Sequence, residues 1–353
     1  MTEQGIILEE LSNAIGVSGK EDAVRNIVLD AIKDHVTDIR IDALGGVTAL
    51  QKGTDSARPR VMLAAHMDEI GFMVTGIDSN GLIRFANIGG VDDRILPGLR
   101  VKIGDAQIPG VIIWTPIHLN RDQSVTKLSN LRIDIGVSSK DSANGKINVG
   151  DRIGFDSQFM ALSETMLRGK AFDDRVGCSI LIDILRAGPY PVDILAAFTV
   201  QEEIGLRGAQ VAAQTLTPDV AIIFEGTTAH DIPDPTAEPD EDEEPNPACR
   251  VGAGPVLTVM DRSMITYPPL LDFLRSTADA AGIPYQLKTQ LGGGTDAGRI
   301  HIAGPGRPAA VISVPCRYIH SPAALMSRND YASVVALAQA ALRNISFDVI
   351  KQG

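Results

Sequence analysis

Four apolar segments of this 353-residue chain each end in side chains that can bind a metal ion. They span residues 60–68, 193–203, 219–225 and 309–320, and each contains an apolar run typical of a buried strand. In an open α/β sheet the carboxyl ends of the strands meet at one crevice, where ligands bind. We therefore expect an α/β sheet with a polar site at its strand ends.

Helical and strand-like patterns alternate through much of the chain. Ser18 and Glu21 have the spacing of a capping box, and apolar residues recur at helical spacing from 24 to 36. After residue 176 the alternation continues to the C-terminal region. Such alternation favours a mostly parallel sheet flanked by helices.

The stretch 72–161 has a different character. It contains short β-like runs separated by Gly-Gly, Pro-Gly and Asn-Gly pairs, and it lacks a convincing amphipathic helix. Closely spaced strands with turn signals predict a small β-barrel or sandwich. We therefore divide the chain into an α/β domain, residues 1–71 and 162–353, and an inserted β-rich domain, residues 72–161. The acidic, proline-rich run 234–247 is predicted to be a mobile surface loop.

Composition excludes several classes of partner. The net charge of −12 argues against nucleic acid, because phosphate binding needs a clustered basic surface. No apolar run approaches the roughly 18 residues of a membrane span, and the N-terminal residues lack a signal-peptide pattern. Cys178, Cys249 and Cys316 are odd in number and scattered, so no disulfide framework is implied. We expect a cytoplasmic protein without nucleic-acid or membrane partners.

The polar residues at the strand ends form a possible two-metal site. Two histidines and three carboxylates in one crevice could hold two divalent cations about 3.5–4 Å apart. Each motif alone also has a structural explanation: a solvated loop, a helix N-terminus, a strand-to-helix turn or a structural histidine. Their convergence from separate strands favours a metal site. The residues are His66, Asp68, Asp173, Glu202, Glu203, Glu225 and His320.

A glycine-rich loop follows a predicted strand near residue 292. It has neither the lysine of a Walker motif nor the G-x-G-x-x-G spacing, so a phosphate loop is not favoured. Glycines let the backbone approach a ligand closely. We therefore expect Gly293, Gly294, Thr295 and Asp296 to line the crevice and contact substrate.

These motifs, in this order, resemble the M42 family of dinuclear metallo-aminopeptidases, which includes glutamyl aminopeptidases and tetrahedral (TET) peptidases. The matching segments are AHMDEIGF at 65–72, GKAFDDRVG at 169–177, QEEIG at 201–205, GGTDA at 293–297 and RYIHSP at 317–322. The resemblance spans nearly the whole chain. It implies a phosphorylase/hydrolase-like zinc peptidase core with an inserted, PDZ-like dimerisation domain, and dimers that assemble into a tetrahedral dodecamer.

The resemblance also assigns roles to single residues. His66 and Glu225 would bind one cation, and Glu203 and His320 the other. Asp173 would bridge the two cations. Glu202 would be the general base, and Asp68 would orient His66. The family often has aspartate at the position of Glu225, which is a departure in this chain.

The expected function is removal of N-terminal residues from short peptides by a water molecule that two metal ions activate. Zinc is the expected metal, with cobalt or manganese as alternatives. Three other functions are kept: an N-acyl amino acid deacylase, a non-catalytic metal-stabilised oligomer and, ranked lowest, an endoglucanase, because glycosidases need no histidine ligands. The preferred N-terminal residue stays open, with Arg299 and Arg317 as candidate walls of a specificity pocket.

Overall fold

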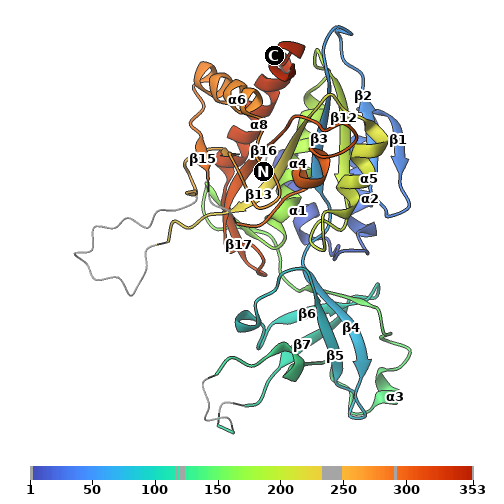
Figure 1. The fold of residues 1–353 in the computed structure, drawn as a ribbon. Coiled ribbons are helices and arrows are strands. Elements are labelled where there is room, and N and C mark those ends of the chain that lie inside the picture. Colours follow the sequence, from blue (N-terminus) through green and yellow to red (C-terminus); the bar gives the residue numbers. More distant parts are fainter. Residues whose placement is uncertain (1–2, 117, 120–123, 233–248, 290–291, 352–353) are drawn as a thin grey trace, which may run out of the picture.

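The computed structural model of the chain describes residues 3–116, 118–119, 124–232, 249–289 and 292–351. Two parts are evident: an α/β part and, below it in the view of Figure 1, a smaller β-barrel. The acidic run 234–247 lies outside the described residues, so the prediction of a mobile loop there stays a prediction.

A mixed sheet forms the centre of the α/β part. Its four middle strands are parallel and lie in the order β12 (Asp193–Thr199), β3 (Arg60–His66), β13 (Val220–Thr228) and β16 (Ala309–Arg317). Antiparallel strands extend both sides: β1 (Thr37–Ile41) and β2 (Val47–Gln51) beside β12, and β17 (Ala324–Ser327), β11 (Met166–Gly169) and β10 (Met160–Ala161) beside β16. Two short strands, β14 (Val256–Thr258) and β15 (Gln286–Lys288), pair with each other, and β14 also pairs with β16.

Helices cover both faces of this sheet. Alternate side chains of β3 point to opposite faces, so Val61 and Leu63 join one core while Met62 and Ala64 join the other. Burial on both faces explains the continuous apolar runs in the sequence. The first core is shared with α1 (Glu3–Asn13), α2 (Asp22–Ile32), α4 (Phe172–Ala187), α6 (Pro268–Ala281) and α8 (Arg328–Asn344), and the second with α5 (Arg207–Leu216) and α7 (Ala297–Ile300). A last short helix, α9 (Phe347–Ile350), packs near α6.

The inserted region folds as a closed barrel. Its strands run in the order β4 (Gly71–Ile77), β5 (Ile83–Ile88), β8 (Arg132–Asp134), β7 (Ile108–Ile113), β6 (Arg100–Ile103) and β9 (Arg152–Phe155). Phe72 makes edge-to-face contacts with Phe85 at 5.1 Å and Phe155 at 5.6 Å, and these rings form the centre of the barrel core. Short helical turns connect the strands: η1 (Asp93–Ile95), η2 (Leu128–Asn130) and α3 (Lys140–Ala143).

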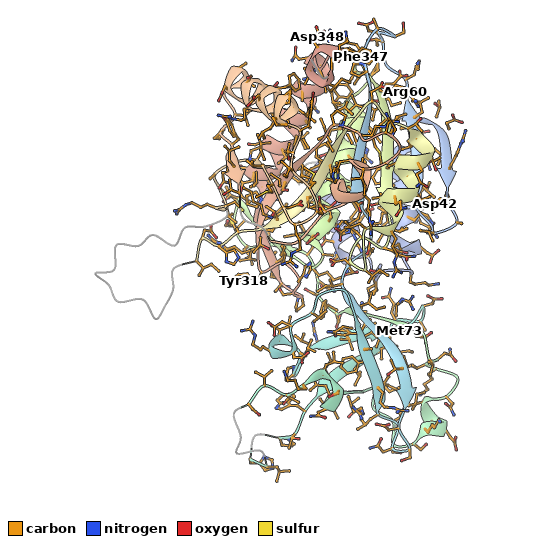
Figure 2. All side chains as sticks on the ribbon, in the orientation of Figure 1. Asp42, Arg60, Met73, Tyr318, Phe347 and Asp348 are labelled. Carbon is orange, nitrogen blue, oxygen red and sulfur yellow. The ribbon has the colours of Figure 1, made fainter. Side chains whose placement is uncertain are left out.

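The parallel strands run toward the barrel. Arg60, at the start of β3, lies at the far end of the α/β part, whereas Tyr318, just after β16, lies at the end nearest the barrel (Figure 2). The expected fold class, a helix-flanked α/β sheet with an inserted β-barrel, is confirmed, with antiparallel strands extending the parallel centre. Among the helices described, none combines the length and apolar character needed to cross a membrane.

Candidate metal centre

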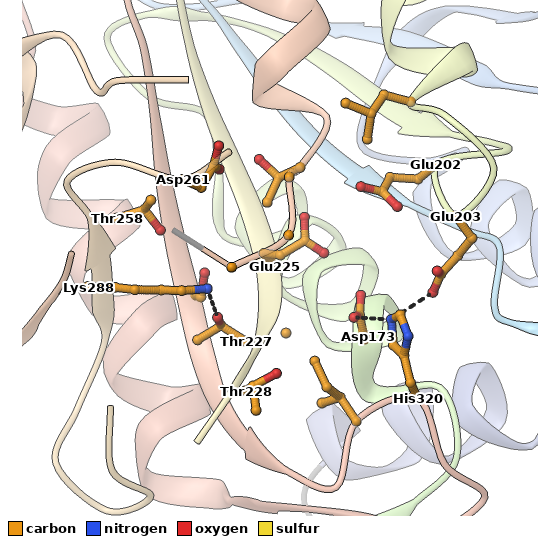
Figure 3. Close-up of a pocket in the computed structure, with 18 of the residues that line it drawn as sticks. Asp173, Glu202, Glu203, Glu225, Thr227, Thr228, Thr258, Asp261, Lys288 and His320 are labelled. Carbon is orange, nitrogen blue, oxygen red and sulfur yellow. Dashed lines mark hydrogen bonds and ion pairs between the residues drawn. The ribbon is translucent and has the colours of Figure 1, made fainter. Parts of the chain in front are cut away.

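Two groups of ligand-type side chains meet at the carboxyl ends of the central strands. His66, Asp174 and Glu225 have ligand atoms within 4.8 Å of one another, and so do Asp173, Glu203 and His320. Figure 3 shows Glu203, Asp173 and His320 directed toward one another on one side of the cavity. The strand-end residues that the sequence pattern singled out are therefore close together in space.

Asp173 lies between the two histidines. Its Oδ1 is 3.1 Å from Nε2 of His66, and its Oδ2 is 3.4 Å from Nε2 of His320. Glu225 Oε1 lies 3.3 Å from the same nitrogen of His66, and Glu203 Oε1 lies 3.5 Å from that of His320. One carboxylate with an oxygen toward each group is the arrangement that a bridging ligand requires.

Both histidines have their other ring nitrogen occupied. Nδ1 of His66 donates to the backbone carbonyl of Asp68 at 3.1 Å, and Nδ1 of His320 donates to that of Gly90 at 2.9 Å. In a neutral imidazole, Nε2 then carries a lone pair and faces carboxylate oxygens. Metal-binding histidines are commonly held in this way, with Nδ1–H on a carbonyl and Nε2 free for the ion.

Neighbouring aspartates at the start of α4 have different roles. The backbone angles of Asp173 and Asp174 are not helical, so the regular turns begin after them. Asp174 is fully buried and accepts hydrogen bonds from the backbone N–H groups of Gly177 and His66, at 2.9 and 3.1 Å. Asp174 therefore matches the helix N-terminus interpretation, whereas Asp173 is free to face the crevice.

Asp68 ties the segments of the crevice together. Its Oδ1 accepts from the backbone N–H of Glu202 at 3.0 Å, and its Oδ2 accepts from that of Glu203 at 3.2 Å and from the Ser18 hydroxyl at 2.6 Å. Asp68 Oδ1 also lies 3.5 Å from Nδ1 of His66. The side chain thus positions the Glu202–Glu203 turn as well as His66, and the sequence pattern indicated only the second role.

A barrel residue also contacts the centre. Gly90 follows β5, and a Cβ atom at this position would lie 3.2 Å from Nδ1 of His320. The carbonyl contact to His320 therefore depends on a close backbone approach. A Gly-Gly pair was apparent in the sequence only as a turn signal, because no local pattern relates it to a histidine 230 residues away.

The crevice concentrates negative charge away from water. Burial, together with the nearby Asp173 carboxylate, raises the pKa of Glu203 to about 8. Burial likewise raises the pKa of Glu225 to about 8, and the pKa of Glu202 well above its ordinary value. Glu203 Oε1 and Glu225 Oε2 are buried without a hydrogen-bond partner among the described residues. Buried carboxylates of this kind are stable when cations neutralise them, so the donor set fits two divalent metal ions.

A second buried charge cluster lies directly behind the crevice. The ammonium of Lys170 donates to both oxygens of Glu69 at 2.7 and 2.9 Å, and Arg175 lies 3.3 Å from the same carboxylate. Arg175 also donates to the carbonyl of Met67 at 2.8 Å. This network connects the segment after β3 to the start of α4, the two segments that carry His66 and Asp173.

Four of the candidate metal ligands, Asp173, Glu203, Glu225 and His320, border a cavity of about 670 Å³. Gly293, Gly294 and Thr295 line it, as the sequence predicts. Asp296 lies behind this wall, is 1% exposed and accepts a hydrogen bond from the Thr199 hydroxyl. The structure therefore places Asp296 behind the loop, where it supports the loop, and its contact with substrate stays a prediction.

Neither candidate arginine lines the cavity, and a lysine does. Arg317 binds both oxygens of Asp231 at 2.7 Å, and Arg299 is exposed on α7. Lys288, the last residue of β15, lines the cavity together with Thr227 and Thr258. Lys288 was not predicted, because no local sequence pattern places the end of β15 beside the cavity.

Sequence comparison gives closely related proteins. The model of the family described as M42 glutamyl aminopeptidase matches residues 45–337. A lysyl aminopeptidase of Pyrococcus furiosus is 34% identical, with 96% of each chain covered. A glutamyl aminopeptidase of Lactococcus lactis is 29% identical, covering 98% of this chain and 97% of its own.

Solved structures have the same fold over the whole chain. A TET aminopeptidase from a marine sediment thaumarchaeon superimposes with a TM-score of 0.91 at 34% identity, covering 99% of both chains. The TET1 peptidase of Pyrococcus horikoshii superimposes with a TM-score of 0.85 at 31% identity, covering 97% of this chain and 100% of its own. That peptidase can assemble into a tetrahedron or a large octahedral shell.

Proposed function

The chain belongs to the M42 glutamyl aminopeptidase family and is a metal-dependent aminopeptidase, and we propose that its catalytic centre is the pair of ligand clusters around Asp173. His66 and Glu225 would hold one divalent cation, Glu203 and His320 the other, and Asp173 would bridge them. When bound, the two cations would polarise the scissile carbonyl and promote ionisation of water. The observation that carries this assignment is the position of Asp173, with one oxygen toward each histidine.

Glu202 is the proposed general base. Its Oε2 lies 4.0 Å from Nε2 of His66, at the edge of the ligand set, and it lines the cavity. Burial raises the pKa of Glu202, which favours its acceptance of a proton from the attacking water. Glu202 then returns this proton to the leaving amine. Asp68 holds Glu202 in place through its backbone N–H and so positions the base.

The proposed substrates are short peptides with a free α-amine. A carboxylate of the crevice or a cation would bind this amine. The bound amine would then place the first peptide carbonyl at the metal centre. Aminoacyl-p-nitroanilides in the presence of zinc, cobalt or manganese test this activity. We expect turnover of free-amine substrates and none of their N-acetylated counterparts. Hydrolysis of the acetylated compounds instead would favour the deacylase alternative, and no turnover across the panel would contradict the proposal.

Zinc is our proposed metal, because two histidines with carboxylates form a donor set that zinc commonly occupies. Cobalt and manganese accept similar ligands. Elemental analysis of protein purified without added metal tests the proposal. Two zinc equivalents per chain are expected, and fewer than about one equivalent of any metal would contradict a tightly bound pair.

We propose that the barrel pairs subunits and that dimers build a twelve-subunit shell. Support comes from the assembling TET1 peptidase, which is similar over its whole length. Light scattering tests both the dimer and the shell, because it measures mass and the chain alone has a mass of 37.5 kDa. A monomer at micromolar concentration would contradict both, and a dimer only the shell.

All three cysteines are free and buried, which supports the proposed cytoplasmic location.

A further inference from the structure

The two proposed cations differ in which parts of the molecule hold their ligands. His66 and Glu225 lie on β3 and β13, and Nδ1 of His66 donates to the carbonyl of Asp68, so these contacts all belong to the α/β part. His320 instead donates to the carbonyl of Gly90 at 2.9 Å, and Gly90 follows β5 of the barrel (Figure 1). The cation site of His320 therefore lies at the boundary between the two parts.

The other ligand of this site, Glu203, contacts the same loop of the barrel. A Cβ atom at Gly89 would lie 3.3 Å from both Cβ and Oε2 of Glu203. A Cβ atom at Gly90 would lie 3.2 Å from Nδ1 of His320. Two consecutive glycines, called here the glycine pair, thus bring the barrel backbone against both side chains that would bind this cation. A side chain at either position would push on the ligand beside it.

The glycine pair is fixed in the barrel. Ile88, the last residue of β5, is buried in the barrel core, and Val91 packs against the same core. The side chain of Asn87 donates to the carbonyl of Val91 at 3.4 Å and closes the loop around the pair. The position of the pair therefore follows the position of the barrel.

Gly89 has a matched counterpart elsewhere in the barrel. Its φ of +78° lies in the left-handed region that favours glycine, and its Cβ atom would also lie 2.7 Å from Cγ2 of Ile70. Gly136 has a φ of +77°, and among the described residues nothing lies within 4 Å of its Cβ position. Alanine at these two positions would cost similar backbone strain, and only alanine at Gly89 would press on Glu203.

Close packing of glycines could serve only to fit the barrel against the α/β part. The hydrogen bond from His320 indicates a further role, because the Gly90 carbonyl fixes Nδ1 and so directs Nε2 of the same ring. That Nε2 lies 3.5 Å from Oε1 of Glu203 and 3.4 Å from Oδ2 of Asp173. Figure 3 shows these three side chains directed toward one another. The barrel loop therefore contacts the ligands where their geometry decides the affinity for a cation.

We propose that Gly89 and Gly90 are positioning residues for one cation only. Through them the barrel sets the places of Glu203 and His320, so the affinity for this cation depends on the barrel, and the affinity for the other does not. The inference rests on the two-cation centre proposed above and adds the residues that distinguish its halves. Outer contacts of metal ligands commonly change metal affinity by about 10- to 100-fold.

The test measures cobalt binding to chelator-stripped protein by equilibrium dialysis over a range of free cobalt concentrations. Wild type should bind two equivalents per chain. Gly89→Ala and Gly90→Ala should each bind one equivalent with wild-type affinity and the other about 10- to 100-fold more weakly. Gly136→Ala is the control and should bind both as wild type does. Thermal melting without metal checks folding, and Gly90→Ala carries the test if Gly89→Ala is unfolded, because φ of Gly90 is not left-handed.

Combined variants identify the equivalent that is weakened. Adding Gly90→Ala to His320→Ala should cause no further loss of cobalt affinity, because both changes act on the same cation. Adding Gly90→Ala to His66→Ala should weaken the equivalent that remains. The opposite pattern would assign the effect of Gly90 to the cation of His66 and would contradict the proposal.

Two further results would overturn the proposal. Unchanged affinities in both glycine variants would exclude a positioning role. Equal weakening of both equivalents would indicate a general effect of packing between the two parts. Each of these results leaves the metal centre standing, since wild type would still bind two equivalents. Fewer than two equivalents in wild type would instead contradict the two-cation centre, and this inference with it.

Discussion

Two buried charge clusters lie back to back in this molecule, and they differ in balance. Behind the crevice, Glu69 is matched by Lys170 and Arg175, and all three side chains are at most 2% exposed. In the crevice, carboxylates gather around two histidines, and Oε1 of Glu203 and Oε2 of Glu225 are buried without a hydrogen-bond partner among the described residues. The buried carboxylates of the two clusters therefore differ in how far their charge is compensated.

The same two sequence segments supply both clusters. Along the chain after β3, His66 and Asp68 contact the crevice, while Met67 and Glu69 contact Arg175. Side chains of neighbouring residues in extended backbone point to opposite sides, which separates Asp68 from Glu69, whereas Met67 reaches Arg175 through its backbone carbonyl. The compensated cluster connects the two segments, and the uncompensated cluster is the one that we propose binds cations.

The largest expected effect is the loss of turnover when the proposed general base of the crevice is replaced. Glu202→Gln removes the proposed base and leaves the ligands intact, so kcat should fall by about 10²- to 10⁴-fold. Binding of metal should still raise the melting temperature as in wild type. Steady-state kinetics and thermal melting with and without zinc measure both quantities. Glu10→Gln, an exposed glutamate on α1, is the control, and wild-type turnover by Glu202→Gln would contradict its role.

Breaking the compensated cluster should affect stability even without metal. Glu69→Ala leaves Lys170 and Arg175 buried without a carboxylate, and we expect a loss of about 3–5 kcal/mol in the free energy of unfolding. Urea denaturation of metal-free protein measures it. Lys52→Ala breaks an ion pair with Asp193 whose lysine is 68% exposed, and the loss there should stay below about 1 kcal/mol. Equal losses in the two variants would mean that the Glu69 cluster is not stabilising.

The uncompensated cluster should respond to pH. Burial raises the pKa values of Glu203 and Glu225 to about 8, so the folded metal-free protein keeps protons that the unfolded chain releases. Its stability should therefore decrease as pH rises from the ordinary glutamate pKa toward 8, by about 1 kcal/mol per unit for each group. Glu203→Gln should reduce this slope. Unfolding across pH 5–8 measures it, and a slope that Glu203→Gln leaves unchanged would contradict the assignment.

The smallest effect comes from a pair of buried serines, one beside each cluster. Ser18 donates to Asp68 at 2.6 Å, and Ser12 donates to the carbonyl of Lys170 at 2.8 Å. Each alanine variant should lose about 1 kcal/mol of stability. Only Ser18→Ala should also lower kcat/KM, by up to about tenfold, because Asp68 positions Glu202. Equal kcat/KM values for Ser18→Ala and Ser12→Ala would contradict the role of Asp68 in positioning Glu202.

The sequence predicts the strand-end ligands because each follows an apolar run, and it predicts the barrel from its turn signals. The family resemblance singled out Asp173, but residue patterns alone did not distinguish it from Asp174, since their different roles depend on non-helical backbone at the start of α4. Asp296 was placed in the crevice because its loop is, although its side chain turns toward Thr199. The contacts of Gly90 with His320 and of Lys288 with Thr227 join distant segments, and only the folded sheet and barrel bring them together.

The central claim is that the crevice holds two catalytic cations per chain. Protein stripped by a chelator and dialysed is titrated with zinc or cobalt while hydrolysis of a free-amine aminoacyl-p-nitroanilide is followed. We predict no turnover in the stripped protein and a rise that reaches its plateau at about two equivalents per chain, the number that a two-metal hydrolytic site requires. Full turnover by the stripped protein would contradict the account. The same metal dependence and plateau in the His66→Ala and His320→Ala variants would also contradict it, because the catalytic metal would then not be bound at these histidines.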